Sequence, residues 1–165
     1  MIRYHHYITS MDKYLIRKST LEELNDQPLP IKQEYILGII GSSSNTKWNR
    51  ETMIDTVLNP FVGNEGRMPD KVLTPTDGIT STIIECWANI HKIACVPYEA
   101  NWVCMGRRAK AIRDSRILKE ATHVIFFVGP RSDIYEKMAM REAKKGKHVY
   151  TVDPVTHELV EWSIS

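Results

Sequence analysis

The stretch HVIFFVGPRSDIYEKMAMREAKKGKHVYTV, residues 123–152, decides the fold. It begins with a continuous apolar run, HVIFFV (123–128), which is typical of a strand buried on both faces of a parallel sheet. The polar turn GPRSD follows, and then the pattern predicts a helix over residues 134–145 and a strand over residues 148–152. This order of elements predicts a parallel strand–helix–strand unit with a right-handed crossover.

The same alternation extends upstream. Further strands are expected over residues 35–40, 71–74 and 93–98, and further helices over about 50–62, 80–91 and 106–120. The tail THELVEWSI (156–164) alternates and is compatible with an additional edge strand. Residues 35–165 therefore predict one α/β domain, a Rossmann-like open parallel sheet of about five strands with flanking helices.

Residues 1–34 form a separate N-terminal extension in this interpretation. They contain several tyrosines, the pair His5–His6 and a short helix signal that ends at Pro28-Leu-Pro30. The segment is too short to build a core of its own. We expect it to pack outside the domain or on a neighbouring subunit. By analogy with related folds, which often form dimers or larger rings, we also expect a homo-oligomer.

Composition narrows the classes of function. Lys and Arg number 22 against 20 for Asp and Glu, a formal charge of +2 that gives no strong signal of nucleic-acid binding. The N-terminus has no apolar run typical of a signal peptide or membrane anchor. The three cysteines, Cys86, Cys95 and Cys104, form no CxxC pair, and no HxxxH or HExxH pattern occurs. We therefore expect a cytoplasmic protein with reduced thiols, no metal and no cofactor.

Polar loops follow the predicted parallel strands, and such loops meet at one edge of the sheet, where ligands bind in open α/β folds. The first loop begins Gly41-Ser42-Ser43, whose backbone N–H groups and hydroxyls are suited to holding a phosphate. The alternative is an ordinary strand-to-helix loop, because neither GxGxxG nor a P-loop is present.

The loop after residue 128 is more specific. Gly129, Arg131 and Ser132 are predicted to bind the ligand, with Arg131 supplying positive charge for an anion. Glu136 is a predicted catalytic residue, acting on a sugar as nucleophile, general base or acceptor for ribose hydroxyls. The alternative is structural, since Ser132 or Asp133 can cap the helix and Glu136 can close a capping box.

The loop after residue 98 adds two candidates. Trp102 is predicted either to stack on a base or simply to pack the loop. Arg113, two turns into the following helix, is predicted as a ligand-binding residue, with a structural salt bridge as the alternative.

With these loops in order, the chain resembles the SLOG superfamily of Rossmann-like nucleotide-binding proteins, and it is most similar to the YspA-like branch. The resemblance covers residues 35–153 and rests on short motifs in the order of that branch. The first motif is Gly41-Ser42-Ser43, and the second is Leu73 to Gly78 with Trp87-Ala88. The third is Ala100-Asn101-Trp102, continued by Gly106, Ala109, Arg113 and Asp114. The fourth is Gly129 with Ser132, and the fifth is Gly146 with Val149. It departs from the family pattern where Pro75, Thr76, Pro130 and Arg131 stand at glycine positions.

The resemblance implies a nucleotide-like or phosphoribosyl small-molecule ligand. The neighbouring LOG phosphoribohydrolases and nucleoside 2-deoxyribosyltransferases align their functional glutamate with Glu136 and their polar turn with Asp133, so the resemblance implies that Asp133 and Glu136 form the catalytic pair. Cleavage of the N-glycosidic bond of a nucleoside monophosphate is the reaction that this implies. The alternative is a catalytically degenerate Rossmann-like scaffold that acts in assembly or partner binding, which the altered glycine loops favour.

Overall fold

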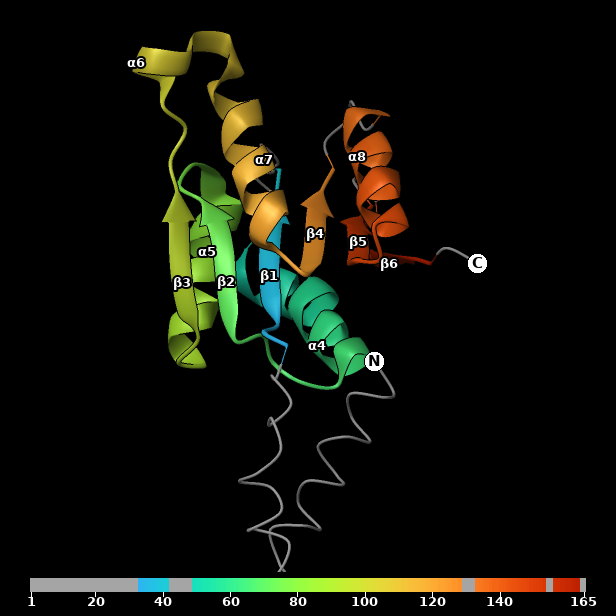
Figure 1. Cartoon of the computed structure of the whole chain (residues 1–165). Coiled ribbons are helices and arrows are strands. Elements are labelled where there is room, and N and C mark those ends of the chain that lie inside the picture. Colours follow the sequence, from blue (N-terminus) through green and yellow to red (C-terminus); the bar gives the residue numbers. More distant parts are fainter. Residues whose placement is uncertain (1–32, 42–48, 129–132, 154–155, 164–165) are drawn as a thin grey trace, which may run out of the picture. The chain divides into compact units, whose positions relative to one another are not determined.

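Five parallel strands and one antiparallel strand form a single sheet in the computed structural model of the chain. The structure describes residues 33–41, 49–128, 133–153 and 156–163. The strands are β1 (Ile36–Ile40), β2 (Lys71–Pro75), β3 (Ala94–Tyr98), β4 (His123–Phe127), β5 (His148–Val152) and β6 (Leu159–Trp162). Their order across the sheet is β3-β2-β1-β4-β5-β6 (Figure 1).

Helical segments connect the strands. They are α3 (Arg50–Met53), the π-helical turn η1 (Ile54–Leu58), α4 (Asn59–Glu65), α5 (Gly78–Ile90), α6 (Trp102–Met105), the 3₁₀ turn η2 (Gly106–Arg108), α7 (Ala109–Glu120) and α8 (Asp133–Lys144). The helix predicted over residues 50–62 is therefore three consecutive segments. The π turn lies immediately before Pro60, which has no N–H to continue the α-helical ladder, and a widened turn accommodates this.

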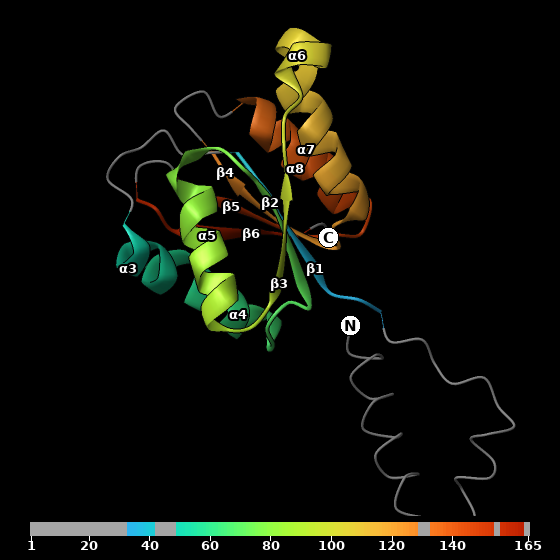
Figure 2. The same ribbon diagram turned by 90° about the vertical axis from the view of Figure 1, so that its left-hand side faces the viewer.

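The helices cover both faces of the sheet, as Figures 1 and 2 show. On one face, α4 and α5 pack through Phe61 and Trp87 against Leu37 and Ile39. On the other, α7 and α8 pack on the alternate residues of the same strands, with Ile117 and Ala139 in the same cluster as Ile36, Ile40 and Phe126. Burial on both faces explains why these strands are continuous apolar runs rather than alternating ones.

Gly38 sets how closely α7 approaches the sheet. A Cβ at this position would lie 2.8 Å from the Cβ of Ala121 and 2.9 Å from Cγ2 of Ile117. Only glycine therefore allows the end of α7 to lie directly on β1.

The predicted α/β architecture is confirmed, with one addition. The tail forms β6, an antiparallel sixth strand paired with β5 from Val149↔Trp162 to Val152↔Leu159. The strand starts predicted at Tyr35 and Ile93 each move by one residue, to Ile36 and Ala94. The predicted N-terminal extension, residues 1–34, lies outside the described residues except for Gln33 and Glu34.

The two ends of the parallel strands form two different edges. We call the ends at Ile40, Pro75, Tyr98, Phe127 and Val152 the carboxyl edge. The opposite ends, at Ile36, Lys71, Ala94, His123 and His148, form the amino edge. The predicted ligand-binding loops all follow the carboxyl edge.

Candidate functional site

The strand order reverses between β1 and β4. From β1 the chain continues through β2 and β3 on one side, and α4 and α5 cover one face. From β4 it continues to β5 on the other side, and α8 covers the opposite face. The segments that leave β1 and β4 thus diverge, and in open α/β sheets such a switch point at the carboxyl edge is where ligands bind.

Gly41 ends β1 at this switch point, with φ of +84°. A Cβ there would lie 2.4 Å from the carbonyl oxygen of Phe127, the last residue of β4. The glycine is therefore required by the close approach of two neighbouring strand ends, before any ligand is considered. Its predicted contact with a phosphate stays a prediction.

Arg113 is the centre of a buried charged cluster behind this edge. Its Nη1 donates to Oδ1 of Asp77 at 2.6 Å, and its Nε donates to Oδ1 of Asp114 at 3.2 Å. The Arg113 side chain is 1% exposed, that of Asp114 is 6% exposed and that of Asp77 is 50% exposed. These pairs give Arg113 the salt-bridge role that the sequence offered as the alternative, and they leave its predicted role toward a ligand open.

Burial has a larger effect than charge pairing on the pKa values of this cluster. Burial raises the pKa of Asp114, and the neighbouring Arg113 guanidinium, which acts in the opposite direction, does not offset it. Burial, and then the charge of Asp114, raises the pKa of Tyr135 on α8. Nη2 of Arg113 lies 3.2 Å from Oδ1 of Asp114, so the buried guanidinium is ion-paired with both carboxylates. The cluster therefore ties the start of α5 to α7 beneath the carboxyl edge, and its charges act on Tyr135 of α8.

Asp133 and Glu136 both lie in the first turn of α8 and are exposed. Figure 1 places this end of α8 beyond the end of β4, at the carboxyl edge. The structure thus brings the predicted catalytic pair to the predicted edge. Its predicted action on a sugar stays a prediction.

Trp102 lies farther out. It is the first residue of α6, a short helix that stands beyond the end of β3 (Figure 2), and it is 57% exposed. Asn101 caps this helix by accepting a hydrogen bond from the N–H of Cys104 at 3.1 Å. Of the two predicted roles, the packing one is not apparent in the described contacts, and base stacking stays a prediction.

The remaining predicted ligand-binding residues lie outside the described residues. They are Ser42, Ser43, Gly129, Arg131 and Ser132. One small hollow is present beside this region, lined by Thr74, Ser81, Glu85, Cys95 and their neighbours, with a volume of about 110 Å³. A pocket for a nucleotide-sized ligand is roughly 300–1,000 Å³, so this hollow fits at most a small group of the ligand.

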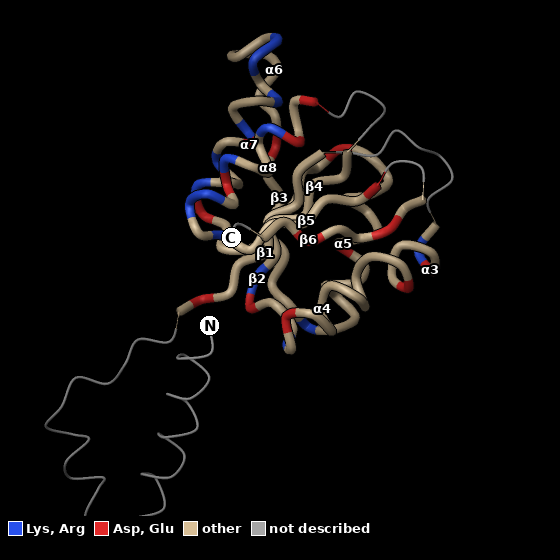
Figure 3. The backbone as a smooth tube through the Cα atoms, turned by 90° about the vertical axis from the view of Figure 1, so that its right-hand side faces the viewer, with Lys and Arg blue, Asp and Glu red and all other residues tan. Residues whose placement is uncertain are grey.

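Positive charge is arranged around the same edge. Lys and Arg residues gather along α7 in Figure 3, and Arg107 and Arg108 lie in η2 immediately before it, at the carboxyl-edge end. The N-termini of α5, α7 and α8 follow the carboxyl ends of β2, β3 and β4. Helix N-termini carry partial positive charge, so this edge is suited to an anion.

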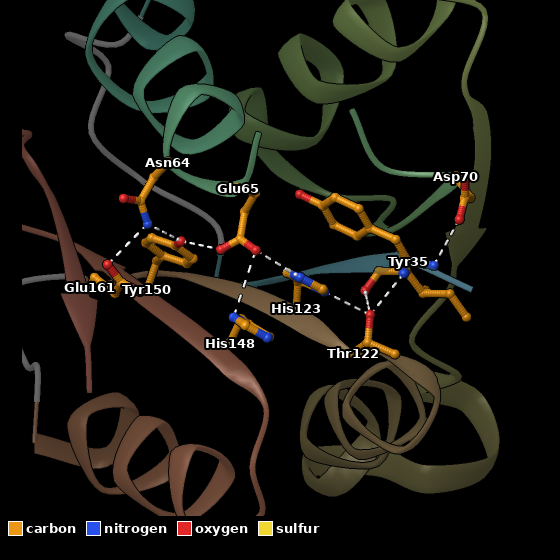
Figure 4. A network of polar contacts seen from close by, with 10 residues as sticks. Tyr35, Asn64, Glu65, Asp70, Thr122, His123, His148, Tyr150 and Glu161 are labelled. Atoms are coloured by element: carbon orange, nitrogen blue, oxygen red, sulfur yellow. Dashed lines mark hydrogen bonds and ion pairs between the residues drawn. The ribbon is translucent and has the colours of Figure 1, made fainter. Parts of the chain in front are cut away.

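A second polar cluster, which sequence reasoning missed, lies at the amino edge (Figure 4). Glu65 ends α4, His123 begins β4 and His148 begins β5. The signal that was available is that two neighbouring parallel strands both begin with histidine, and their register pairs His123 with His148. The contribution of Glu65 depends on how α4 packs, which no local pattern indicates.

The amino-edge cluster is closely bonded. Oε1 of Glu65 lies 3.0 Å from Nε2 of His123, and the Tyr150 hydroxyl donates to Oε2. Burial alone would raise the pKa of Glu65, yet the hydrogen bonds from His123 and Tyr150 outweigh it and hold that pKa below its ordinary value. Burial, and then the proximity of His123, lowers the pKa of His148. The cluster thus favours a charged carboxylate beside an uncharged imidazole of His148.

Comparison of the chain with protein-family models, with curated proteins and with solved structures gives no match. Within the described ranges, no helix has the length and apolar character needed to cross a membrane.

Proposed function

We propose that the carboxyl edge, at the switch point between β1 and β4, binds a nucleotide-like or phosphoribosyl ligand. The observation that carries the proposal is that the two neighbouring strands at this point are followed by Gly41 on one side and by the exposed pair Asp133 and Glu136 on the other. The resemblance to SLOG proteins, the basic start of α7 and the three helix N-termini support the same ligand class.

The proposed reaction is hydrolysis of the N-glycosidic bond of a nucleoside monophosphate. The bond between the base nitrogen and C1′ breaks, an oxygen from water becomes bonded to C1′, and the base leaves with a proton. Glu136 would act at the ribose, as nucleophile or as general base toward water, and Asp133 would assist it. Arg131, Ser42 and Ser43 would bind the 5′-phosphate.

Isothermal titration with AMP, adenosine, ribose 5-phosphate and inorganic phosphate tests the binding. Arg131→Ala should weaken AMP binding about 10- to 100-fold and adenosine binding far less, because a hydrogen bond to a charged group contributes about 1.5–3 kcal/mol. Arg141→Ala is the matched control, since the exposed Arg141 lies two turns or more along α8 from its start. Absence of binding by the unaltered chain to all four probes at millimolar concentration would refute the proposal.

An assay of base release tests the reaction separately from binding. Glu136→Gln keeps the shape of the side chain and removes its charge, so turnover should fall at least 100-fold while AMP binding is retained. Asp55→Asn, at an exposed position in η1, is the control for a lost surface charge. Equal turnover in the Glu136→Gln variant and the unaltered chain would remove Glu136 from the reaction.

The second candidate, a scaffold that acts in assembly, is favoured by one observation. Apolar side chains are exposed along β3 and the neighbouring α5 and α6, namely Ile79, Ile90, Val96, Trp102, Val103 and Met105. Val103 is 97% exposed. A second copy of this chain is the proposed partner, and light scattering of Val103→Asp tests it: the mass should fall to that of a monomer, and an unchanged mass would exclude this surface.

A further inference from the structure

Three potential metal ligands converge at the amino edge, at the opposite ends of the strands from the proposed nucleotide site. They are the carboxylate of Glu65, the imidazole of His123 and the imidazole of His148. They come from three elements, α4, β4 and β5, whose relative positions are fixed by the sheet and its core (Figure 4). The site is therefore built by the fold and not by a local sequence motif.

The donor atoms are close to the spacing of a bound cation. Oε1 of Glu65 lies 3.0 Å from Nε2 of His123 and 3.6 Å from Nδ1 of His148, and all three atoms lie within 4.8 Å of one another. A tetrahedral Zn²⁺ with donors at about 2.0–2.1 Å keeps those donors about 3.3 Å apart. Two of the three separations thus match, and only the gap between the two histidines must close.

Closing that gap requires one ring to turn. The rings of His123 and His148 are stacked, with centroids 4.4 Å apart and planes 9° apart, whereas a bound metal lies in the plane of each ligating imidazole. His148 is the ring that can move, because its side chain is 29% exposed and its 3.6 Å contact with Glu65 is beyond hydrogen-bond range. His123 is 7% exposed and is also stacked on Tyr35 with centroids 3.9 Å apart, so it stays in place.

The hydrogen bonds around His123 are compatible with loss of the Nε2 proton. Nδ1 of His123 lies 2.7 Å from Oγ1 of Thr122, which also accepts from the N–H of Ile36 and lies 3.2 Å from the Ile36 carbonyl oxygen. In the imidazole with its proton on Nε2, the Thr122 hydroxyl donates to Nδ1. When Nε2 binds a metal, Nδ1–H can donate to Thr122 and the hydroxyl can turn to the Ile36 carbonyl. Such an outer partner is what metal-ligating histidines ordinarily have.

The Glu65 carboxylate is oriented by a hydrogen bond to Oε2, the oxygen that does not face the histidines. The Tyr150 hydroxyl donates to Oε2 of Glu65 and accepts from Nδ2 of Asn64 at 2.6 Å. These bonds hold Glu65 so that Oε1 faces both histidines. Glu65 is 3% exposed, which means that the carboxylate is already desolvated and held where a cation would need it.

We propose that Glu65, His123 and His148 bind one divalent cation of the Zn²⁺ class. Two imidazoles and one carboxylate form the donor set that zinc accepts when a fourth position is left to water, and harder cations such as Mg²⁺ prefer oxygen donors alone. The partly exposed His148 gives the cation its route in. The bound cation would join the end of α4 to the starts of β4 and β5, and so stabilise the fold.

Zinc titration of the full chain tests the proposal, with isothermal titration for affinity and thermal unfolding as the second readout. The expected result is one high-affinity site and a melting temperature that rises with Zn²⁺ concentration. His148→Ala should weaken that site at least 10-fold and remove the thermal shift. The fold should survive this change because the His148 side chain is partly exposed and its only described polar contact is the 3.6 Å one with Glu65, while its backbone N–H keeps its bond to the Thr122 carbonyl oxygen.

Two controls test the N-terminal histidine pair and the cysteines as alternative zinc ligands. The His5→Gln/His6→Gln double variant should keep the high-affinity site, because His5–His6 is a separate histidine pair at the start of the sequence. Titration with Co²⁺ should give visible absorption without the intense near-ultraviolet band of thiolate ligation, which excludes Cys86, Cys95 and Cys104. Unchanged affinity in His148→Ala, loss of the site in the double variant, a thiolate band, or no binding by the unaltered chain would each overturn the proposal.

Discussion

The carboxyl and amino edges of the sheet differ in how their polar groups are satisfied. At the amino edge, Glu65, Thr122, His123 and Tyr150 are hydrogen-bonded to their neighbours. At the carboxyl edge, the predicted catalytic carboxylates are exposed, and the Arg113 guanidinium behind them is paired with Asp77 and Asp114. Strand ends of the same sheet thus give one edge whose carboxylate and imidazole groups are bonded to one another and one edge whose carboxylates face solvent, where a larger ligand can reach them.

Removing the buried guanidinium of Arg113 at the carboxyl edge should have the largest effect on stability. Arg113→Met leaves Asp114 buried without its partner, and uncompensated buried charges typically cost about 3–5 kcal/mol. Urea unfolding measures the loss. Arg141→Met is the matched control, because Arg141 is 59% exposed and its loss should cost less than about 0.5 kcal/mol. Equal effects in the two variants would show that the Arg113 cluster is not buried in solution.

The next largest effect should come from Gly41→Ala at the switch point. The change places an L side chain at a positive φ and a Cβ against the Phe127 carbonyl, which together should cost about 3 kcal/mol. Gly66→Ala separates the two causes, since Gly66 has nearly the same φ of +82° with nothing within 4 Å of its Cβ. It should cost about 1 kcal/mol in the same unfolding measurement, and a loss as large as that of Gly41→Ala would attribute the effect to backbone strain alone.

The two edges should respond to pH in opposite directions. The lowered pKa of Glu65 means that, above that pKa and below about pH 4.3, the unfolded chain binds more protons, so stability rises with pH in that window. The raised pKa of Asp114 means that, above about pH 3.9 and below that pKa, the folded chain binds more protons, so stability falls with pH.

Unfolding of two variants between pH 3 and 7, with a chelator present, separates these contributions. Glu65→Gln should make stability rise less steeply with pH, because it removes the amino-edge contribution. Asp114→Asn should make it rise more steeply, because it removes the opposing one. The same change of slope in both variants would contradict the assignment of opposite signs to the two edges.

The smallest effect on stability should come from Glu136→Gln. Glu136 is exposed, and within the described ranges its structural contribution is the interaction of a charge with the start of α8, so the loss should stay below about 0.5 kcal/mol. Thermal unfolding without ligand measures it. A loss of more than 1 kcal/mol would mean that Glu136 is held by contacts of its own, and a structural role would then explain its position.

The sequence predicted the strands because burial on both faces leaves a plain signal. The run at 35–40 is apolar throughout, that at 123–128 is apolar after its first residue, His123, and each became a fully buried strand. The tail strand was only compatible with the pattern, since β6 is half exposed and its antiparallel pairing depends on β5. The π turn was not predicted, because it follows from how the chain accommodates Pro60 within a continuous helical run.

The candidate site was predictable in its location and not in its contacts. Topology alone places loops after parallel strands at one edge, and Gly41 and Glu136 were found there. The pairing of Arg113 with Asp77 joins residues 36 positions apart, and that of His123 with Glu65 joins residues 58 apart. Such contacts depend on how helices pack on the sheet, so neither the Arg113 cluster nor the amino-edge ligands could be derived from local patterns.

Backbone amide NMR of the labelled full chain, titrated with AMP, tests the central claim most directly. The account predicts shifts at Gly41, at Phe127 and over residues 133–136, which surround the switch point, and none at His123 or His148. The same sample titrated with Zn²⁺ should shift His123 and His148 and leave the first group unchanged. AMP-induced shifts at the amino edge, or no shift at any residue at millimolar AMP, would contradict the claim that the carboxyl edge is the nucleotide site.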